Sequence, residues 1–192
     1  KGPGPLSPES VEALAGVAYL EMPTGLGKSR VGAAVIARRG EPALVVTPTV
    51  AIAEQWVEEV ELLYPELKVD VYKNPPAGSR RAAPTPQTHD VVVIVINTFR
   101  DKTPEFMNGY GTVIFDEAHE YHSAQNQKGL WLAQTRAVLG LSATPLERPD
   151  GIDRYVLLHL GNVIQCKDIP NFDTGSVKFS GAVTQLEYVG HP

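Results

Sequence analysis

The stretch 21–29 does most to limit what this 192-residue chain can fold into. It reads Glu-Met-Pro-Thr-Gly-Leu-Gly-Lys-Ser, follows the apolar run 17–20 and leads into a helical pattern over 30–38. Gly25 and Gly27 allow the backbone to turn sharply and to approach an anion closely. The start of a helix adds free N–H groups and a positive dipole end. A strand, a tight loop and a helix in this order are the context of a phosphate-binding loop.

The loop departs at one position from the template G-x-x-x-x-G-K-[ST], whose first glycine falls where this chain has Met22. In the template the lysine, here Lys28, reaches the β- and γ-phosphates, and the hydroxyl of Ser29 ligates Mg²⁺. The competing interpretation is a glycine-rich turn that happens to include a lysine. We predict ATP binding by seven consecutive residues: Pro23, Thr24, Gly25, Leu26, Gly27, Lys28 and Ser29.

Composition places the chain among ordinary globular proteins. It is 43% hydrophobic and 20% charged, and its length suits one domain with its own core. The apolar run 91–96 is far too short to span a bilayer, and residues 1–5 contain no hydrophobic signal segment. The single cysteine, Cys166, excludes an internal disulfide and a zinc site made of several cysteines. We expect a soluble, intracellular protein without a membrane partner.

Charge is distributed unevenly along the chain. The net charge is −5, which argues against strong non-specific binding to nucleic acid. Between positions 73 and 102, however, five basic residues face two acidic ones, whereas 54–70 holds six acids and a single lysine. Because phosphate contacts need only a local basic surface, the overall sign does not decide the partner.

Short apolar runs alternate with helical patterns, which is typical of an α/β fold. The helix over 50–64 is the clearest, with an apolar stripe at helical spacing and four glutamates on its other sides, which we interpret as a solvated face. The proline-rich segment 73–90 is expected to be an exposed, mobile loop. Strands are predicted over 17–20, 43–47, 68–72, 91–96, 112–115, 137–141 and 182–188, and further helices over 10–15 and 152–160. Unbroken β-branched runs such as 91–96 indicate parallel strands that are covered on both faces.

An acidic motif, Asp116-Glu117-Ala118-His119, follows the predicted strand over 112–115. Carboxylates at the carboxyl end of a parallel strand lie at the edge where open α/β sheets bind ligands. In a phosphate-binding domain Asp116 would hold Mg²⁺ beside Ser29, and Glu117 would orient and deprotonate the attacking water.

Other interpretations of the acidic motif remain. The two carboxylates could be a solvated strand end, and His119 and His122 could be surface residues. A zinc motif His-Glu-x-x-His is excluded, because position 123 is Ser123.

An ordered series of motifs resembles the first RecA-like domain of a DEAH-type superfamily 2 helicase or translocase. The segment 22–29 resembles motif I, including its non-glycine start. Val-Thr-Pro-Thr at 46–49 with Glu-Gln-Trp at 54–56 resembles motif Ia, and 94–99 resembles the segment after the fourth strand. Asp-Glu-Ala-His matches motif II, and Ser-Ala-Thr-Pro at 142–145 matches motif III. The similarity covers residues 17–150 and is greatest to DNA-acting members: repair and transcription translocases, restriction-enzyme motors and helicases of large viruses and phages.

The resemblance implies a three-layer RecA-like P-loop domain with a mostly parallel sheet, and ATP hydrolysis with Mg²⁺. It assigns catalysis to Lys28, Asp116, Glu117 and His119, metal binding to Ser29 and Asp116, and coupling of the two sites to Ser142, Ala143 and Thr144. Nucleic-acid contacts, to DNA rather than RNA, fall to Pro48, Thr49, Thr98, Phe99 and Arg100. Small hydroxyl residues and helix starts are chemically suited to phosphates. For Thr49 a helix cap, and for Phe99 a place in the core, are the alternatives.

Two features depart from the family pattern. No glutamine that could recognise adenine precedes the glycine loop, and nothing after residue 150 resembles the second RecA-like domain that supplies an arginine finger. We expect a flexible leader over 1–9, the ATP-binding domain over 10–160 and a C-terminal extension over 161–192 towards that second domain. Alone, the chain would be weakly active or inactive. A P-loop small-molecule kinase and a non-catalytic binding module remain the alternative functions.

Overall fold

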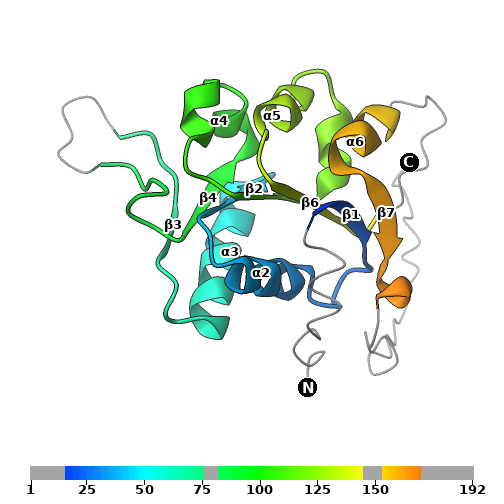
Figure 1. Ribbon diagram of the computed structural model, residues 1–192, viewed down its shortest axis with the longest axis horizontal. Coiled ribbons are helices and arrows are strands. Elements are labelled where there is room, and N and C mark those ends of the chain that lie inside the picture. Colours follow the sequence, from blue (N-terminus) through cyan, green and yellow to red (C-terminus); the bar gives the residue numbers. More distant parts are fainter. Residues whose placement is uncertain (1–15, 76–81, 145–152, 170–192) are drawn as a thin grey trace, which may run out of the picture.

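A central parallel sheet covered by helices on both faces forms the described part of the chain, residues 16–75, 82–144 and 153–169 of the computed structural model (Figure 1). The seven strands follow the order β3-β4-β2-β5-β6-β1-β7, and every pair of neighbours is parallel. The strands are β1 (Val17–Glu21), β2 (Ala43–Thr47), β3 (Val69–Val71), β4 (Val91–Val95), β5 (Thr112–Asp116), β6 (Ala137–Ser142) and β7 (Asn162–Gln165).

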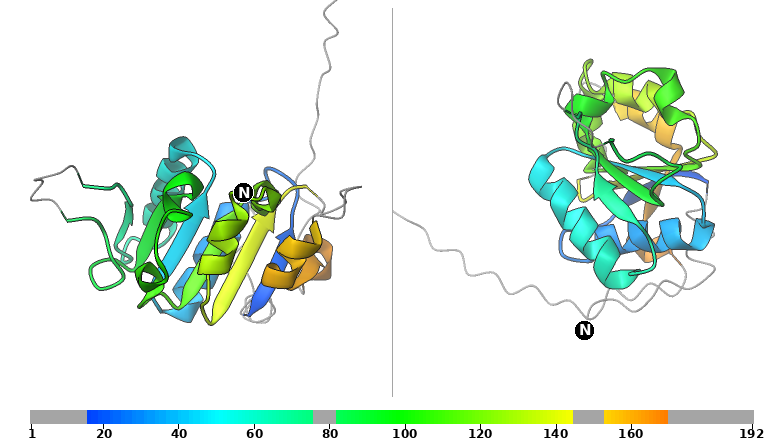
Figure 2. Two further views of the ribbon diagram at one scale, coloured as in Figure 1. Left: turned by 90° about the horizontal axis from the view of Figure 1, so that it is seen from above. Right: turned by 90° about the vertical axis from the view of Figure 1, so that its left-hand side faces the viewer.

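The helices divide between the two faces of the sheet. Helices α2 (Lys28–Arg39) and α3 (Val50–Leu63) lie side by side on one face, and α4 (Ile96–Phe99), α5 (Gln127–Leu132) and α6 (Asp153–Leu160) lie on the other (Figures 1 and 2). Three short 3-10 turns complete the described elements: η1 (Pro104–Met107), η2 (Ala118–His122) and η3 (Cys166–Asp168). The three-layer α/β fold is therefore the one that the sequence predicted.

The central strands are buried along their whole length. Every residue of β2, β5 and β6 is buried, because helices shield both faces of the sheet from water. Side chains of alternate strand residues enter two apolar clusters, one under each helical layer. This explains why the strands read as continuous apolar runs instead of alternating patterns.

The parallel arrangement brings the carboxyl ends of all strands to one edge of the sheet. The loop after β1 and the acidic residues that end β5 meet there, with only β6 between the two strands. Functional side chains that lie far apart in the sequence can therefore converge.

Element boundaries differ from the expected ones at a few places. Residue Ile96 begins α4 instead of ending β4, and β3 is one residue shorter at each end than predicted. Strand β7, which pairs with β1 at the edge of the sheet, was not predicted from the sequence. The helix expected over 10–15 and the strand expected over 182–188 lie outside the described residues, as does part of the loop 73–90.

Candidate functional site

The glycine loop connects β1 to α2. Gly25 and Gly27 adopt positive φ angles of 81° and 86°, a conformation that glycine reaches without steric cost. Met22, at the place of the first glycine of the template, is fully buried in the core beneath the loop, and its N–H donates to the carbonyl of Ser142 (2.8 Å). A large apolar residue is accommodated here because its side chain packs in the core, and Met22 does not line the cleft beside the loop.

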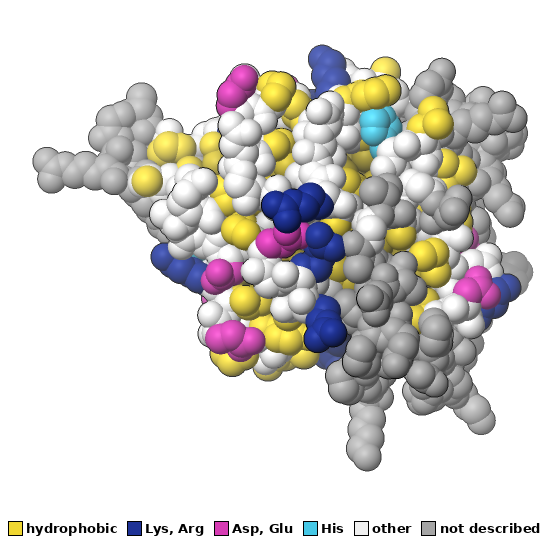
Figure 3. Space-filling model, in the orientation of Figure 1, with side chains coloured by type: hydrophobic (Ala, Val, Ile, Leu, Met, Phe, Trp, Pro, Cys, Tyr) yellow, Lys and Arg dark blue, Asp and Glu magenta, His cyan; other side chains and the backbone are white. Residues whose placement is uncertain are grey.

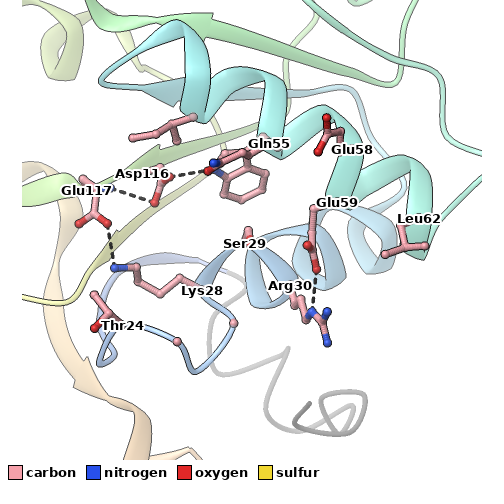
Figure 4. Close-up of a pocket in the computed structure, with 14 residues that line it drawn as sticks. Thr24, Lys28, Ser29, Arg30, Gln55, Glu58, Glu59, Leu62, Asp116 and Glu117 are labelled. Carbon is pink, nitrogen blue, oxygen red and sulfur yellow. Dashed lines mark hydrogen bonds and ion pairs between the residues drawn. The ribbon is translucent and has the colours of Figure 1, made fainter. Parts of the chain in front are cut away.

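Lys28 reaches across to the end of β5. Its Nζ donates to Oε1 of Glu117 at 2.9 Å, and the side chains are 11% and 26% exposed (Figure 4). Residues 89 positions apart in the sequence are therefore in direct contact. Each of the two charges is the other's counter-ion.

Glu117 has an unusual backbone. It is the one non-glycine residue with a positive φ angle (48°) in the described part of the chain. A non-glycine residue held in the left-handed region costs about 1–3 kcal/mol and occurs mostly at functional sites. The strained backbone holds the Glu117 carboxylate beside Lys28 at the start of η2.

Asp116 is buried and held by two donors. Its Oδ2 accepts a hydrogen bond from Nε1 of Trp56 (2.8 Å), and its Oδ1 accepts one from the N–H of Glu117 (3.0 Å). Burial raises the pKa of the Asp116 carboxyl above its usual value, and the indole N–H opposes part of that rise. From the sequence, Trp56 belongs to the apolar stripe of the helix and to the segment that resembles motif Ia, but this contact was not predicted. The signal was available, since a buried tryptophan usually finds a partner for its N–H.

These residues border one cleft of about 780 Å³ between the start of α2 and the side of α3. Figure 4 shows the side chains of Lys28 and Ser29 on α2, with Asp116 and Glu117 opposite. The walls comprise Thr24, Gly25, Gly27, Lys28, Ser29, Arg30, Ile52, Gln55, Trp56, Glu58, Glu59, Leu62, Asp116 and Glu117. Of the predicted ATP-binding residues, Pro23 is exposed and Leu26 is buried, and neither lines the cleft.

The donor set of the cleft fits Mg²⁺. The Ser29 hydroxyl and the Asp116 carboxylate both border it, and Mg²⁺ prefers oxygen ligands and keeps several waters. Within the described ranges no group of three or more histidine, cysteine or acidic side chains is placed to hold a metal ion.

The predicted coupling residues join β5 to β6. Nδ1 of His119 lies 2.8 Å from Oγ of Ser142, and the same hydroxyl accepts from the N–H of Thr144 (3.1 Å). His119 also lies 3.4 Å from Oε2 of Glu117. Polar contacts therefore run from the lysine of the glycine loop, through Glu117 and His119, to the segment after β6. Ala143, between the two coupling hydroxyl residues, is partly exposed.

The residues predicted to contact nucleic acid do not share one environment. Thr49 is exposed and caps α3, with its Oγ1 accepting from the N–H of Ile52 (3.3 Å), and Pro48 is partly exposed beside it. Thr98 is partly exposed, and Arg100 donates to Oδ1 of Asn126 (3.1 Å).

Phe99 requires a correction. It is fully buried and packs against Phe106 and Phe115, because the short helix α4 turns this position into the core. The surface contact predicted for Phe99 is wrong, and the alternative, a core residue, is correct.

Basic side chains are not concentrated in a single patch on the face shown in Figure 3. Among the described residues of that face, Lys and Arg lie beside Asp and Glu. The described helices include none that combines the length and apolarity needed to cross a membrane.

A family model matches most of the chain. The model described as type III restriction enzyme, res subunit, matches residues 9–147. A protein of African swine fever virus named "Putative ATP-dependent RNA helicase" is 43% identical over 174 residues, which is 91% of this chain and 32% of the viral protein. The DNA 3'-5' translocase XPB2 of Sulfurisphaera tokodaii is 26% identical over 148 residues, 77% of this chain and 31% of that protein. The chain thus spans about a third of the length of these relatives.

Solved structures share the fold. The SWI2/SNF2 ATPase core of Sulfolobus solfataricus, solved in complex with dsDNA, superposes with a TM-score of 0.65 at 19% identity, covering 79% of this chain and 32% of that one. The Hef helicase domain of Pyrococcus furiosus superposes with a TM-score of 0.63 at 22% identity. The match covers 81% of this chain and 36% of the Hef chain. The matched model shows that the chain belongs to the family of the type III restriction enzyme, res subunit, and its fold is that of the solved helicase and ATPase domains.

Proposed function

We propose that this domain is the ATP-binding lobe of a nucleic-acid-dependent ATPase of the DEAH-type superfamily 2 class. One observation supports this above all others. Lys28 from the glycine loop and the acid pair from β5 face one cleft, with Lys28 Nζ 2.9 Å from Glu117 Oε1 and Ser29 on the same wall. A triphosphate bound to the loop would meet a cation, a metal-ligating hydroxyl and two carboxylates.

Each residue of the cleft has a separate proposed role in ATP hydrolysis. The free N–H groups at the start of α2 and the Lys28 ammonium bind the phosphates, so Lys28 must exchange Glu117 for phosphate when nucleotide enters. Ser29 and Asp116 would hold Mg²⁺, which supplies charge stabilisation to the transferred phosphoryl group. Release from Lys28 leaves the Glu117 carboxylate free to orient a water molecule and accept its proton.

His119, Ser142 and Thr144 form the proposed connection between nucleotide and nucleic acid. His119 lies two positions after Glu117, the proposed base. Its Nδ1 lies 2.8 Å from Oγ of Ser142, the last residue of β6. A movement of Glu117 on nucleotide binding would therefore change the contacts of the segment that follows β6. Pro48, Thr49, Thr98 and Arg100 remain the proposed backbone contacts to the strand, since none of the four is fully buried.

We propose that the nucleic acid bound by this domain is DNA. The XPB2 relative is named a DNA translocase and the SWI2/SNF2 core was solved with dsDNA, whereas the African swine fever virus relative has RNA helicase in its name. A second RecA-like domain of the same polypeptide would complete the site and supply an arginine finger. The relatives, about three times as long as the matched region, have room for such a domain.

The test is ATP hydrolysis by a polypeptide that includes the second lobe. We expect hydrolysis that requires Mg²⁺ and is stimulated by single- or double-stranded DNA more than by RNA of the same length. Stronger stimulation by RNA would reverse the strand preference and keep the motor assignment. No stimulation by either, with phosphate transfer to a small metabolite instead, would replace the motor by a kinase.

A further inference from the structure

Trp56 is held rigidly between α2, α3 and the sheet. The residue is 1% exposed. It occupies space that Gly32 of α2 leaves open, because a Cβ added at Gly32 would lie 2.5 Å from Cη2 of the indole and 3.2 Å from Ile114. A ring enclosed in this way has one orientation, and its single polar group therefore has one direction.

That polar group points at a carboxylate and not at a backbone carbonyl. Nε1 donates to Oδ2 of Asp116 at 2.8 Å, while Oδ1 accepts from the N–H of Glu117 at 3.0 Å. An indole N–H can only donate, and an ionised carboxylate can accept about four hydrogen bonds. Each oxygen thus accepts from one protein donor and keeps acceptor capacity for a further ligand, and Asp116 lines the same cleft as Ser29.

We propose that Trp56 is a positioning residue for Asp116, and that its N–H fixes the carboxylate in the orientation that binds Mg²⁺ with the nucleotide. This inference rests on the proposed function, because Asp116 is a metal ligand only if the cleft binds Mg·ATP. Partners that orient the ligands of a metal typically change metal affinity by about 10–100-fold when they are removed. The role is specific: it concerns the metal and not the binding of phosphates by the glycine loop.

Trp56→Phe tests the role, since phenylalanine keeps an aromatic ring and removes the N–H. The probe is N-methylanthraniloyl-ADP, whose affinity is measured once with Mg²⁺ and once with EDTA. We expect the affinity with Mg²⁺ to fall about 10-fold, and the affinity in EDTA to stay at the level of the unmodified chain. A ring that only packs would lower both affinities equally, so equal losses, or no loss, overturn the proposal.

The matched control is Trp131→Phe, which changes an exposed tryptophan (58% exposed) on α5, outside the cleft. It should bind the probe as the unmodified chain does under both conditions. Should the unmodified chain fail to bind the probe, or bind it no better with Mg²⁺ than with EDTA, the proposed function itself fails, which is a different result from an unaffected Trp56→Phe.

A second measurement does not depend on the folding of Trp56→Phe. The Trp131→Phe protein retains a single indole, because the chain has two tryptophans, and its ¹H–¹⁵N resonance therefore belongs to Trp56. We expect this resonance to exchange slowly with solvent, and to shift when Mg²⁺ is added to the ADP complex, since the accepting carboxylate then also ligates a metal. A resonance that is unchanged by Mg²⁺ overturns the proposal.

Discussion

The cleft beside the glycine loop differs from the segment 98–100, which was predicted to contact nucleic acid. The predicted residues of the cleft lie together, whereas those of the segment lie in different environments. In the cleft, Lys28, Asp116 and Glu117 come from two distant segments and lie within one network of hydrogen bonds. In the segment 98–100, Thr98 and Arg100 are partly exposed, while Phe99 between them is fully buried. The position of the acidic motif at the end of a β-strand indicates which edge of the sheet its side chains reach. The position of a motif on a short helix does not indicate which of its side chains are exposed.

The cause is the geometry of the two backbones. The carboxyl ends of parallel strands all face one edge, so residues after β1 and β5 must meet there. Helix α4 spans only four residues, and its 100° turn per residue points neighbouring side chains to different sides. Ile96 and Phe99, three positions apart on the helix, therefore both face the core, while Thr98 beside them is partly exposed.

The largest effect is expected from Glu117→Gln in the two-lobe protein. Glutamine keeps the size of the side chain but cannot accept the proton of the attacking water. ATP hydrolysis should fall by about 10²–10⁴-fold, the usual contribution of a general base. Release of inorganic phosphate under saturating DNA measures the effect.

Glu61→Gln is the matched control, because Glu61 is an exposed residue of α3 that does not border the cleft. It should leave hydrolysis unchanged. Loss of stability does not account for a slow Glu117→Gln enzyme, since a partly exposed ion pair such as that with Lys28 contributes about 1 kcal/mol or less. Normal hydrolysis in Glu117→Gln would sink the assignment of the cleft.

Phe99→Ala should show the opposite behaviour, a large effect on folding. Truncating a buried phenylalanine costs about 3–5 kcal/mol through lost burial and the cavity left behind. Urea unfolding of the chain measures this loss, with Phe106→Ala as a comparison in which a partly buried neighbour is truncated and the loss should be smaller. A Phe99→Ala protein as stable as the unmodified chain would mean that the residue is free to reach a ligand.

The sequence predicted the fold class, the six strands β1 to β6 and the places of the glycine loop and the acidic motif after β1 and β5. These follow from local chemistry: a glycine loop between strand and helix, or a run such as 91–95, has few alternative structures. What it could not predict depends on packing between distant segments. The Trp56–Asp116 hydrogen bond spans 60 positions, α4 replaces the last strand residue, and β7 is recognisable as a strand only beside β1.

A smaller effect is expected from Gly32→Ala in α2, which sharpens the view of the cleft as a packed unit. The added methyl group would lie 2.5 Å from the Trp56 ring, and overpacking of this kind costs about 1–3 kcal/mol, reduced by the better helix propensity of alanine, about 1 kcal/mol. Thermal unfolding measures the sum. Combined with Trp56→Phe, whose smaller ring makes room, the two losses should be less than additive; strict additivity would show that the two residues do not contact each other.

The smallest effect, at Thr49, separates the two roles considered for one residue. Its Oγ1 accepts from the N–H of Ile52 and caps α3, so Thr49→Ala should cost about 1 kcal/mol, a fall in melting temperature of about 2–4 °C for a domain of this size. Thr49→Asp should keep the melting temperature, because aspartate caps equally well and its charge suits the start of a helix. If a nucleic-acid phosphate also lies at this exposed helix start, the added carboxylate repels it, and Thr49→Asp should weaken DNA binding several-fold while Thr49→Ser binds normally. A Thr49→Asp protein that is stable and binds DNA like the unmodified one leaves Thr49 as a cap alone, and the strand must then pass elsewhere along the edge of the sheet.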